Sequence, residues 1–159
     1  MLHVPELPFS PADAINLLES QYFDNAATRP TAVMGSSLGG YYALGLAAKY
    51  NLNAAVLNPA VSPYELLRSF MGDNVNLYTG LNYQFTPAHI HELLAIRIDR
   101  NVYRRGQVMV LLQSGDQILD SREAATLLAD QPQWIFPGGT HEFENFETVI
   151  PAVISHFRM

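Results

Sequence analysis

The feature that most constrains the fold of this chain is a repeated alternation of short apolar runs with segments of helical spacing. The clearest apolar run, Val108–Gln113, reads Val-Met-Val-Leu-Leu-Gln, which is typical of a strand buried on both faces. Similar runs occupy 31–34, 54–57 and 133–136, and a helix-like segment follows each of them. Alternating strands and helices predict a mostly parallel sheet with helices on both faces, because parallel strands need crossover connections.

Helix-capping residues and prolines predict where several helices begin and where one strand ends. Residues 2–4 form a short apolar run before Pro5 and are expected to be the last part of a strand. Ser10 is expected to cap the next helix, with Pro11 at its first position, and Ser121 is expected to cap a later one. Pro151 predicts that the final helix, over about 146–157, is kinked or starts late.

The alternation is interrupted over residues 62–105. Ser62-Pro63-Tyr64-Glu65 has the pattern of a capping box, and a second helix is expected from Thr86 to about Arg97. A polar stretch rich in Gly and Asn lies between the two helices, over 72–84. Two helices are more than a plain crossover needs. The segment therefore predicts a small helical cap inserted into a single domain over 1–159.

Composition excludes several classes of function. The 159 residues carry a net charge of −6, which disfavours binding to nucleic acid. The chain has no cysteine, so disulfides, thiolate catalysis and Cys-ligated zinc are excluded. No apolar stretch approaches the ~20 residues of a membrane span. His89 and His91 are two residues apart and do not form a metal pair on a helix, so we expect no metal and no cofactor.

A Gly-x-Ser-x-Gly motif is centred on Ser37, between a predicted strand and a predicted helix. In such a context the serine stands on a sharp, strained turn, and the two glycines leave room for the turn and for the helix. The N–H of Leu38 would then face a developing oxyanion. A plain Gly-rich turn is the alternative. A phosphate-binding loop is disfavoured because Gly-Lys-Ser/Thr is absent.

Two further residues complete a candidate triad in the order Ser, acid, His that is typical of α/β-hydrolases. Asp116 follows the strand 108–113, and His141 follows the strand 133–136. The carboxyl ends of parallel strands meet at one edge of a sheet, so these side chains are expected to lie close to Ser37. Asp120 is a rival acid, although it also suits the start of a helix.

With these motifs the chain resembles the YqiA-like family of small bacterial α/β-hydrolase esterases over nearly its whole length. The likeness is carried by these stretches: Val4-Pro5-Glu6-Leu7-Pro8, Met34-Gly35-Ser36-Ser37-Leu38-Gly39-Gly40, Leu57-Asn58-Pro59-Ala60-Val61, Pro63-Tyr64-Glu65-Leu66-Leu67, Tyr78-Thr79-Gly80, Leu111-Leu112-Gln113-Ser114-Gly115-Asp116, Ile118-Leu119-Asp120, and Gly138-Gly139 with His141 and Phe143. The resemblance implies a cytoplasmic carboxylic-ester or acyl-thioester hydrolase with Ser37 as nucleophile, Asp116 as acid and His141 as base.

The chain departs from the family at its start. Family members begin with a strand that ends in a His-Gly-Phe-like loop, which would supply a second oxyanion donor, and nothing like it precedes Met1. The absent strand would lie between 2–4 and 31–34. The chain would then be a fragment, or its first strand would pair with the nucleophile strand, or another chain, such as a second copy of this one, would fill the gap. Loss of one oxyanion donor typically costs about 10²–10³ in turnover.

Three functions remain open on the sequence. The leading hypothesis is hydrolysis of a small ester or acyl thioester, with an acyl pocket formed by the insertion. Its candidate lining is Phe70, Leu77, Tyr78, Tyr83 and Phe85, which could equally be plain packing. The second is a non-catalytic binding or interaction protein without a complete oxyanion hole. The third is acyl transfer to an acceptor other than water.

Overall fold

A computed structural model describes residues 2–76, 79–96 and 99–159 of the chain. The chain divides into two compact units. The first unit comprises Met1–Pro30 and Ser62–Arg97, and the second comprises Thr31–Val61 and Ile98–Met159. A single domain with a cap over 62–105 stays a prediction.

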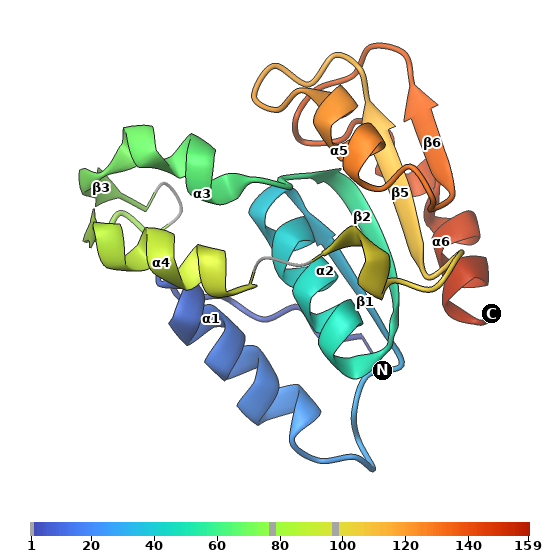
Figure 1. Ribbon diagram of the computed structural model, residues 1–159, viewed down its shortest axis with the longest axis horizontal. Helices are drawn as coiled ribbons and strands as arrows, with labels where there is room; N and C mark the ends of the chain where they lie inside the picture. The colour runs from blue at the N-terminus through green and yellow to red at the C-terminus, as the bar shows by residue number, and fades with distance from the viewer. Residues whose placement is uncertain (1, 77–78, 97–98) are drawn as a thin grey trace. The chain divides into compact units, whose positions relative to one another are not determined.

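The second unit contains a four-stranded parallel sheet (Figure 1). Its strands are β1 (Ala32–Ser36), β2 (Asn53–Pro59), β5 (Val108–Gln113) and β6 (Gln133–Phe136), in the order β1-β2-β5-β6. Every pairing in this sheet is parallel, so the predicted parallel sheet is confirmed. The pairs Met34–Ala55, Ala55–Met109 and Leu111–Trp134 fix the register.

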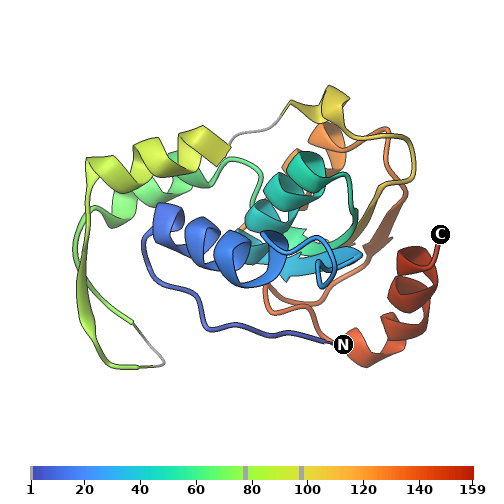
Figure 2. The ribbon, with the colours of Figure 1, turned by 90° about the horizontal axis from the view of Figure 1, so that it is seen from below.

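Helices cover both faces of this sheet, as predicted (Figure 2). Side chains alternate along each strand, so Ala54 and Val56 face one side while Ala55 and Leu57 face the other. The first side packs against α2 (Ser37–Tyr50) and α5 (Ser121–Leu127). The second side packs against α6 (Ile150–Phe157). Each fully buried Val or Leu in these layers contributes about 1.5–3 kcal/mol.

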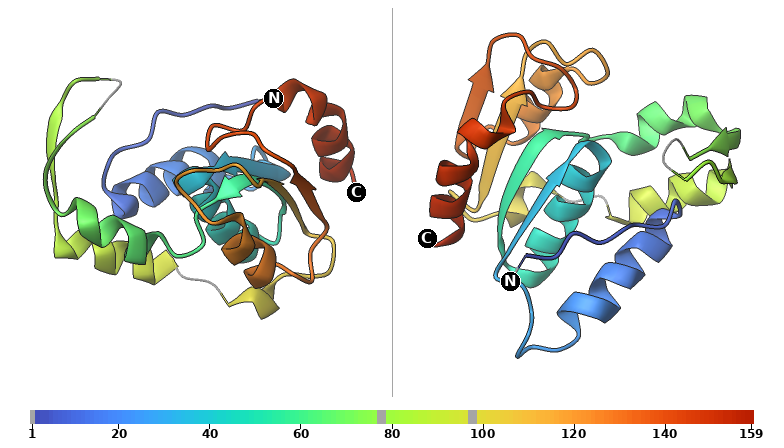
Figure 3. Two further views of the ribbon diagram at one scale, coloured as in Figure 1. Left: turned by 90° about the horizontal axis from the view of Figure 1, so that it is seen from above. Right: turned by 180° about the vertical axis from the view of Figure 1, so that it is seen from behind.

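Strand β1, which leads into the turn at Ser37, is an outer strand of the sheet (Figure 3). Among the described residues it pairs with β2 alone, and Met34 is 45% exposed. The strand predicted at residues 2–4 is wrong. Leu2 and Val4 are 83% and 84% exposed, so the apolar run buries no surface that would favour a strand.

Helix ends agree with the sequence signals in part. Ser10 caps α1 (Pro11–Leu18) by accepting a hydrogen bond from the Asp13 N–H at 3.2 Å, as predicted. The α5 helix is capped by Asp120, not by Ser121, because the Asp120 carboxylate accepts from the Arg122 N–H at 3.0 Å.

The starts of two further helices differ in how well they agree with the sequence. The Ser62 side chain makes no cap bond, so the predicted capping box is wrong, and the helix there, α3 (Pro63–Leu66), is a single turn. Pro151 lies in the first turn of α6, which starts late, as predicted, after a 3₁₀ turn η4 (Phe146–Thr148).

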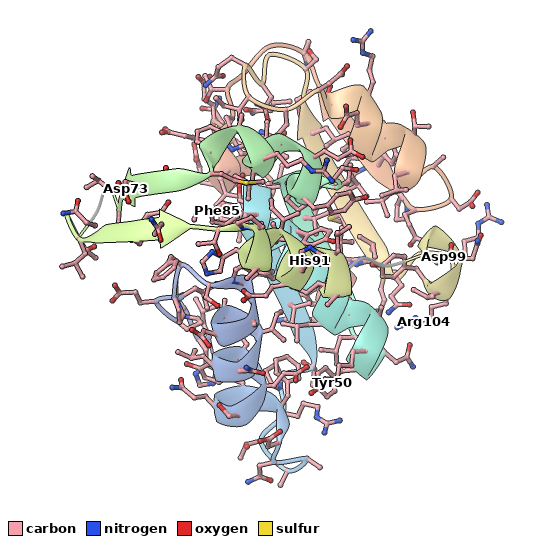
Figure 4. The ribbon with its side chains drawn as sticks, turned by 60° about the vertical axis from the view of Figure 1, so that its left-hand side comes forward. Tyr50, Asp73, Phe85, His91, Asp99 and Arg104 are labelled. Carbon is pink, nitrogen blue, oxygen red and sulfur yellow. The ribbon has the colours of Figure 1, made fainter. Side chains whose placement is uncertain are left out.

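The first unit consists of helices and one antiparallel hairpin. Its remaining elements are a π-helical turn η1 (Glu19–Phe23), a 3₁₀ turn η2 (Leu67–Phe70), strands β3 (Gly72–Val75) and β4 (Asn82–Phe85), and α4 (Pro87–Ile96). The expected cap was wholly helical, so the hairpin is a correction. Asp73 lies on β3 and Phe85 ends β4 (Figure 4). Glu92 fastens α4 to α1 by accepting from the Ser10 hydroxyl and the Ala12 N–H, each at 3.1 Å.

The second unit also has a 3₁₀ turn, η3 (Arg100–Val102), before β5. In the described part of the chain, no helix has the length and the apolar character needed to cross a membrane.

Candidate active site

Ser37 occupies a sharp turn between β1 and α2. Its backbone has a φ of 51°, which is uncommon for a residue other than glycine and agrees with the strained turn expected from the motif. The Ser37 carbonyl accepts from the Ala60 N–H at 3.0 Å, which ties the turn to the segment after β2. The serine is therefore held at the carboxyl end of its strand.

The glycines around Ser37 differ in what they contribute. A Cβ at Gly35 would lie within 3.0 Å of backbone atoms of Gly39 and Gly40, and a Cβ at Gly40 would lie 2.8 Å from the Pro59 Cβ. A Cβ at Gly39 would meet nothing within 4 Å. The expectation that both motif glycines leave room is therefore right for Gly35 and wrong for Gly39, whereas Gly40 lets α2 approach β2.

Asp116 lies in the loop that follows β5. Its side chain is 2% exposed, and its Oδ1 accepts from the N–H groups of Ile118 at 2.8 Å and Leu119 at 2.9 Å. Its Oδ2 lies 2.8 Å from the Nδ1 of His141. Both carboxylate oxygens are therefore engaged, and the carboxylate has one fixed orientation.

His141, in the loop after β6, joins this carboxylate to the serine. Its Nε2 lies 2.9 Å from the Ser37 Oγ, and its side chain is 20% exposed. An ionised carboxylate can only accept, so the Nδ1 of the neutral imidazole carries the proton and donates to Asp116. The Nε2 is then free to accept the Ser37 hydroxyl proton. The structure thus brings Ser37, His141 and Asp116 into one hydrogen-bonded row.

The loops that carry Asp116 and His141 are joined by two hydrogen bonds. The Gly115 N–H donates to the Gly138 carbonyl at 2.8 Å, and the Gly138 N–H donates to the Ser114 Oγ at 3.1 Å. A Cβ at Gly115 would lie within 3.0 Å of Gly138 and Gly139. The close approach of the two loops therefore depends on a glycine at this position.

Leu38, the predicted oxyanion donor, is the second residue of α2. The first four N–H groups of a helix have no carbonyl partner within it, and the helix dipole places partial positive charge there. The Leu38 N–H is therefore suited to an anionic oxygen close to Ser37.

Asp120, the rival acid, is engaged elsewhere. Its carboxylate accepts from the Arg122 Nε at 2.9 Å and from the Arg122 Nη2 at 2.7 Å. The hydrogen bond from the Arg122 side chain lowers the pKa of Asp120 and raises the pKa of Arg122. Asp116, rather than Asp120, makes the contact with His141.

The predicted substrate-binding aromatics belong to the first unit. Phe85 is buried and stacks on His89 with ring centres 5.2 Å apart, and Tyr83 stacks on Phe9 at 4.8 Å. Phe70 is exposed. Tyr78 and Leu77 lie outside the described residues. The role of these side chains in binding stays a prediction.

A pocket of about 490 Å³ lies beside the loop that contains Asp116, in the second unit. Its lining is Ser114, Asp116, Gln117, Ile118, Leu119, Asp120, Ser121 and Arg122. Across the described residues, no three His, Asp or Glu side chains are grouped as a metal site would require.

Two buried amides beside the row were missed from the sequence. Asn58, near the end of β2, and Gln113, the last residue of β5, both contact the loop that carries His141. A polar residue that ends an otherwise apolar buried strand was the available signal, because a buried amide must find partners.

The comparisons with known proteins cover nearly the whole chain. The sequence model of the Uncharacterised protein family (UPF0227) matches residues 1–158. Among solved structures, the esterase domain from a Rhodothermus marinus protein is 18% identical with a TM-score of 0.60, over 91% of this chain and 66% of that one. Alpha/beta hydrolase domain-containing protein 10 from mouse is 15% identical with a TM-score of 0.60, over 92% and 68%. Est1E from Butyrivibrio proteoclasticus is 15% identical with a TM-score of 0.68, over 94% and 72%.

These likenesses, together with the parallel sheet between helices, show that the predicted α/β-hydrolase fold is correct. The chain spans 66% of the Rhodothermus domain, a little under two thirds of its length.

Proposed function

Because the chain belongs to the Uncharacterised protein family (UPF0227) and has the α/β-hydrolase fold, we propose that it hydrolyses a carboxylic ester or an acyl thioester through an acyl-enzyme at Ser37. This membership confirms the family resemblance that the sequence motifs indicate. The proposal depends above all on the row Ser37 Oγ–Nε2 His141 Nδ1–Oδ2 Asp116, with spacings of 2.9 and 2.8 Å. The name of the Rhodothermus esterase domain also favours an ester as substrate.

In the first half of the proposed reaction, the Ser37 Oγ attacks the carbonyl carbon while the His141 Nε2 takes the hydroxyl proton. The tetrahedral intermediate then expels the alcohol or thiol, which receives that proton from His141. The acyl group remains on Ser37 as an ester. In the second half, His141 takes a proton from water, the resulting hydroxide attacks the acyl carbon, and the proton returns to the Ser37 Oγ as the acid leaves.

The other groups stabilise charge during these steps. Asp116 holds the imidazole in the tautomer that frees Nε2, and it stabilises the imidazolium that forms. The Leu38 N–H at the start of α2 would donate to the oxyanion, and one such donor is typically worth about 10²–10³ in turnover. The substrate proposed for these steps is a small molecule, and the compartment proposed for the reaction is the cytoplasm.

An esterase assay on matched serine variants tests the proposal. Purified protein is given p-nitrophenyl acetate, p-nitrophenyl butyrate and acetyl-CoA, and the rates are compared for wild type, Ser37→Ala and Ser36→Ala. Ser37→Ala removes the nucleophile and should lower kcat by at least about 10³-fold. Ser36 is exposed and makes no side-chain cap bond, so Ser36→Ala should stay within about twofold of wild type.

Equal rates for the two serine variants would contradict the proposal. A folded wild type that binds these esters without cleaving them would favour the non-catalytic binding protein. Product analysis with an added alcohol acceptor separates hydrolysis from acyl transfer, since only transfer yields a new ester.

A further inference from the structure

We infer that Asn58 and Gln113 are positioning residues that hold the loop of His141 in its reactive place. This inference rests on the proposed function, because it concerns the base of that reaction. Asn58 is the second-last residue of β2, Gln113 is the last residue of β5, and neither has a role in the steps described above.

Asn58 links three segments through one amide. It is 2% exposed, and its Oδ1 accepts from the Gln113 N–H at 2.8 Å. Its Nδ2 donates to the carbonyls of Thr140 at 2.9 Å and His141 at 3.3 Å. Its backbone has a φ of 39°, in the left-handed region that asparagine tolerates better than most residues. The peptide group of the proposed base is therefore tied directly to the end of β2.

Gln113, on β5, makes hydrogen bonds to the same loop. Its side chain is buried, and its Oε1 accepts from the N–H groups of Thr140 at 3.1 Å and Glu144 at 2.9 Å. Its Nε2 donates to the Glu144 carbonyl at 2.8 Å. A Cβ at Gly139 would lie within 3.0 Å of this amide, so the loop backbone rests directly on it.

The two amides together make five hydrogen bonds to the backbone of residues 140–144. This stretch is neither helix nor strand, and Phe143 has a φ of 63°. The Phe143 N–H donates to the Thr140 carbonyl within this stretch, so the other peptide groups need partners from outside it. An amide side chain carries an acceptor oxygen and a donor nitrogen on one rigid group, and each of these positions uses both. We define Asn58 and Gln113 as the amide clamp.

The clamp matters for reaction because the His141 Nε2 must stay within hydrogen-bond reach of the Ser37 Oγ, now 2.9 Å away. A misplacement of about 1 Å by a residue outside the chemistry can cost about 10²-fold in rate. Loosening the loop should therefore lower kcat, whereas substrate binding should change little.

Gln107, the residue immediately before β5, offers a matched control. Like Gln113 it is buried, and its amide also makes three hydrogen bonds. It donates to the carbonyls of Ala47 at 3.0 Å and Leu52 at 2.9 Å, and it accepts from the Arg104 N–H at 3.0 Å. Gln113→Leu and Gln107→Leu thus each remove three side-chain hydrogen bonds, but only the first touches the loop of His141.

The test compares kcat, KM and one NMR signal in the two variants. We expect Gln113→Leu to lower kcat by about 10- to 100-fold with KM within about threefold of wild type. Gln107→Leu should keep kcat within about twofold. The far-downfield signal of the proton between the His141 Nδ1 and Asp116 should broaden or vanish in Gln113→Leu alone.

A second pair covers the case in which a leucine variant does not fold. Asn58→Gly removes three bonds and suits the left-handed backbone, and Asn53→Gly changes a buried asparagine at the other end of β2. Asn53 contacts the His156 carbonyl and the Arg104 guanidinium, away from the row. Loss of kcat and of the signal in Asn58→Gly but not in Asn53→Gly supports the clamp.

The two proposals fail in different ways. A wild type without hydrolytic activity refutes the proposed function, and the NMR signal then decides on the clamp alone. The clamp is overturned if Gln113→Leu and Asn58→Gly fold, match their controls in kcat and keep the NMR signal. Activity of the wild type would leave the proposed function standing in that case.

Discussion

The two glycines of the Gly-x-Ser-x-Gly motif should respond very differently to a single methyl group. In Gly35→Ala the new Cβ would lie within 3.0 Å of three backbone atoms, the carbonyl carbon and oxygen of Gly39 and the nitrogen of Gly40. Backbone atoms cannot rotate away as a side chain can, so β1 and the start of α2 must move apart. In Gly39→Ala the new Cβ would have open space.

The expected magnitudes follow from these surroundings. Overpacking typically costs about 1–3 kcal/mol, and with three immovable neighbours we expect about 3 kcal/mol or more for Gly35→Ala. Gly39 is the third residue of α2, where alanine is favoured over glycine by up to about 1 kcal/mol. Gly39→Ala should therefore leave the free energy of unfolding unchanged or raise it by up to about 1 kcal/mol.

Urea titration followed by circular dichroism measures both changes against wild type at 25 °C. Equal m-values among the three proteins would show that the midpoints report stability. A Gly39→Ala variant as unstable as Gly35→Ala would refute the reasoning, because open space would then not predict tolerance.

Two further predictions concern a pair of carboxylates and a buried tyrosine. Asp116→Asn should lower kcat by about 10⁴-fold, because an asparagine there favours the wrong imidazole tautomer of His141. Asp120→Asn keeps the helix cap and should retain wild-type kcat. A large loss of kcat in Asp120→Asn alone would instead identify Asp120 as the acid. Burial raises the pKa of Tyr103, whose hydroxyl donates to the Leu44 carbonyl at 3.0 Å. The protonated hydroxyl contributes its full stabilisation below the unfolded pKa of about 10, and this contribution falls as the pH rises above that value. In urea unfolding, Tyr103→Phe should therefore be about 1 kcal/mol less stable than wild type at pH 7. Above pH 10 this difference in the free energy of unfolding should shrink by up to about 1.4 kcal/mol per pH unit. A gap that stays constant to pH 11 would count against the buried protonated hydroxyl.

The sheet and the reactive row could be predicted because their signals are local. The strand Val108–Gln113 and the strand Gln133–Phe136 have the predicted bounds, since short apolar runs between turns leave little choice of where a strand begins and ends. Ser37, Asp116 and His141 each lie in the segment that follows a strand of one parallel sheet. Parallel topology then brings them to one edge without any knowledge of long-range contacts.

Other features depend on partners that are distant in sequence or on small local preferences. Residues 2–4 have the apolar character of a strand, but a strand also needs a hydrogen-bonding neighbour, which the sequence does not specify. The hairpin β3–β4 was missed because Asn- and Gly-rich segments favour turns and strand propensity depends strongly on context. The bonds from Gln113 cross 27 to 31 residues, so the strand alone could not reveal its partners.

The most direct test of the row of Ser37, His141 and Asp116 is the mass of the protein after exposure to a fluorophosphonate, with the modified peptide then sequenced. We predict one adduct per chain, attached to Ser37, and no adduct in folded His141→Ala. An adduct on Ser36, or equal labelling with and without the imidazole of residue 141, would contradict the proposed nucleophile and its base.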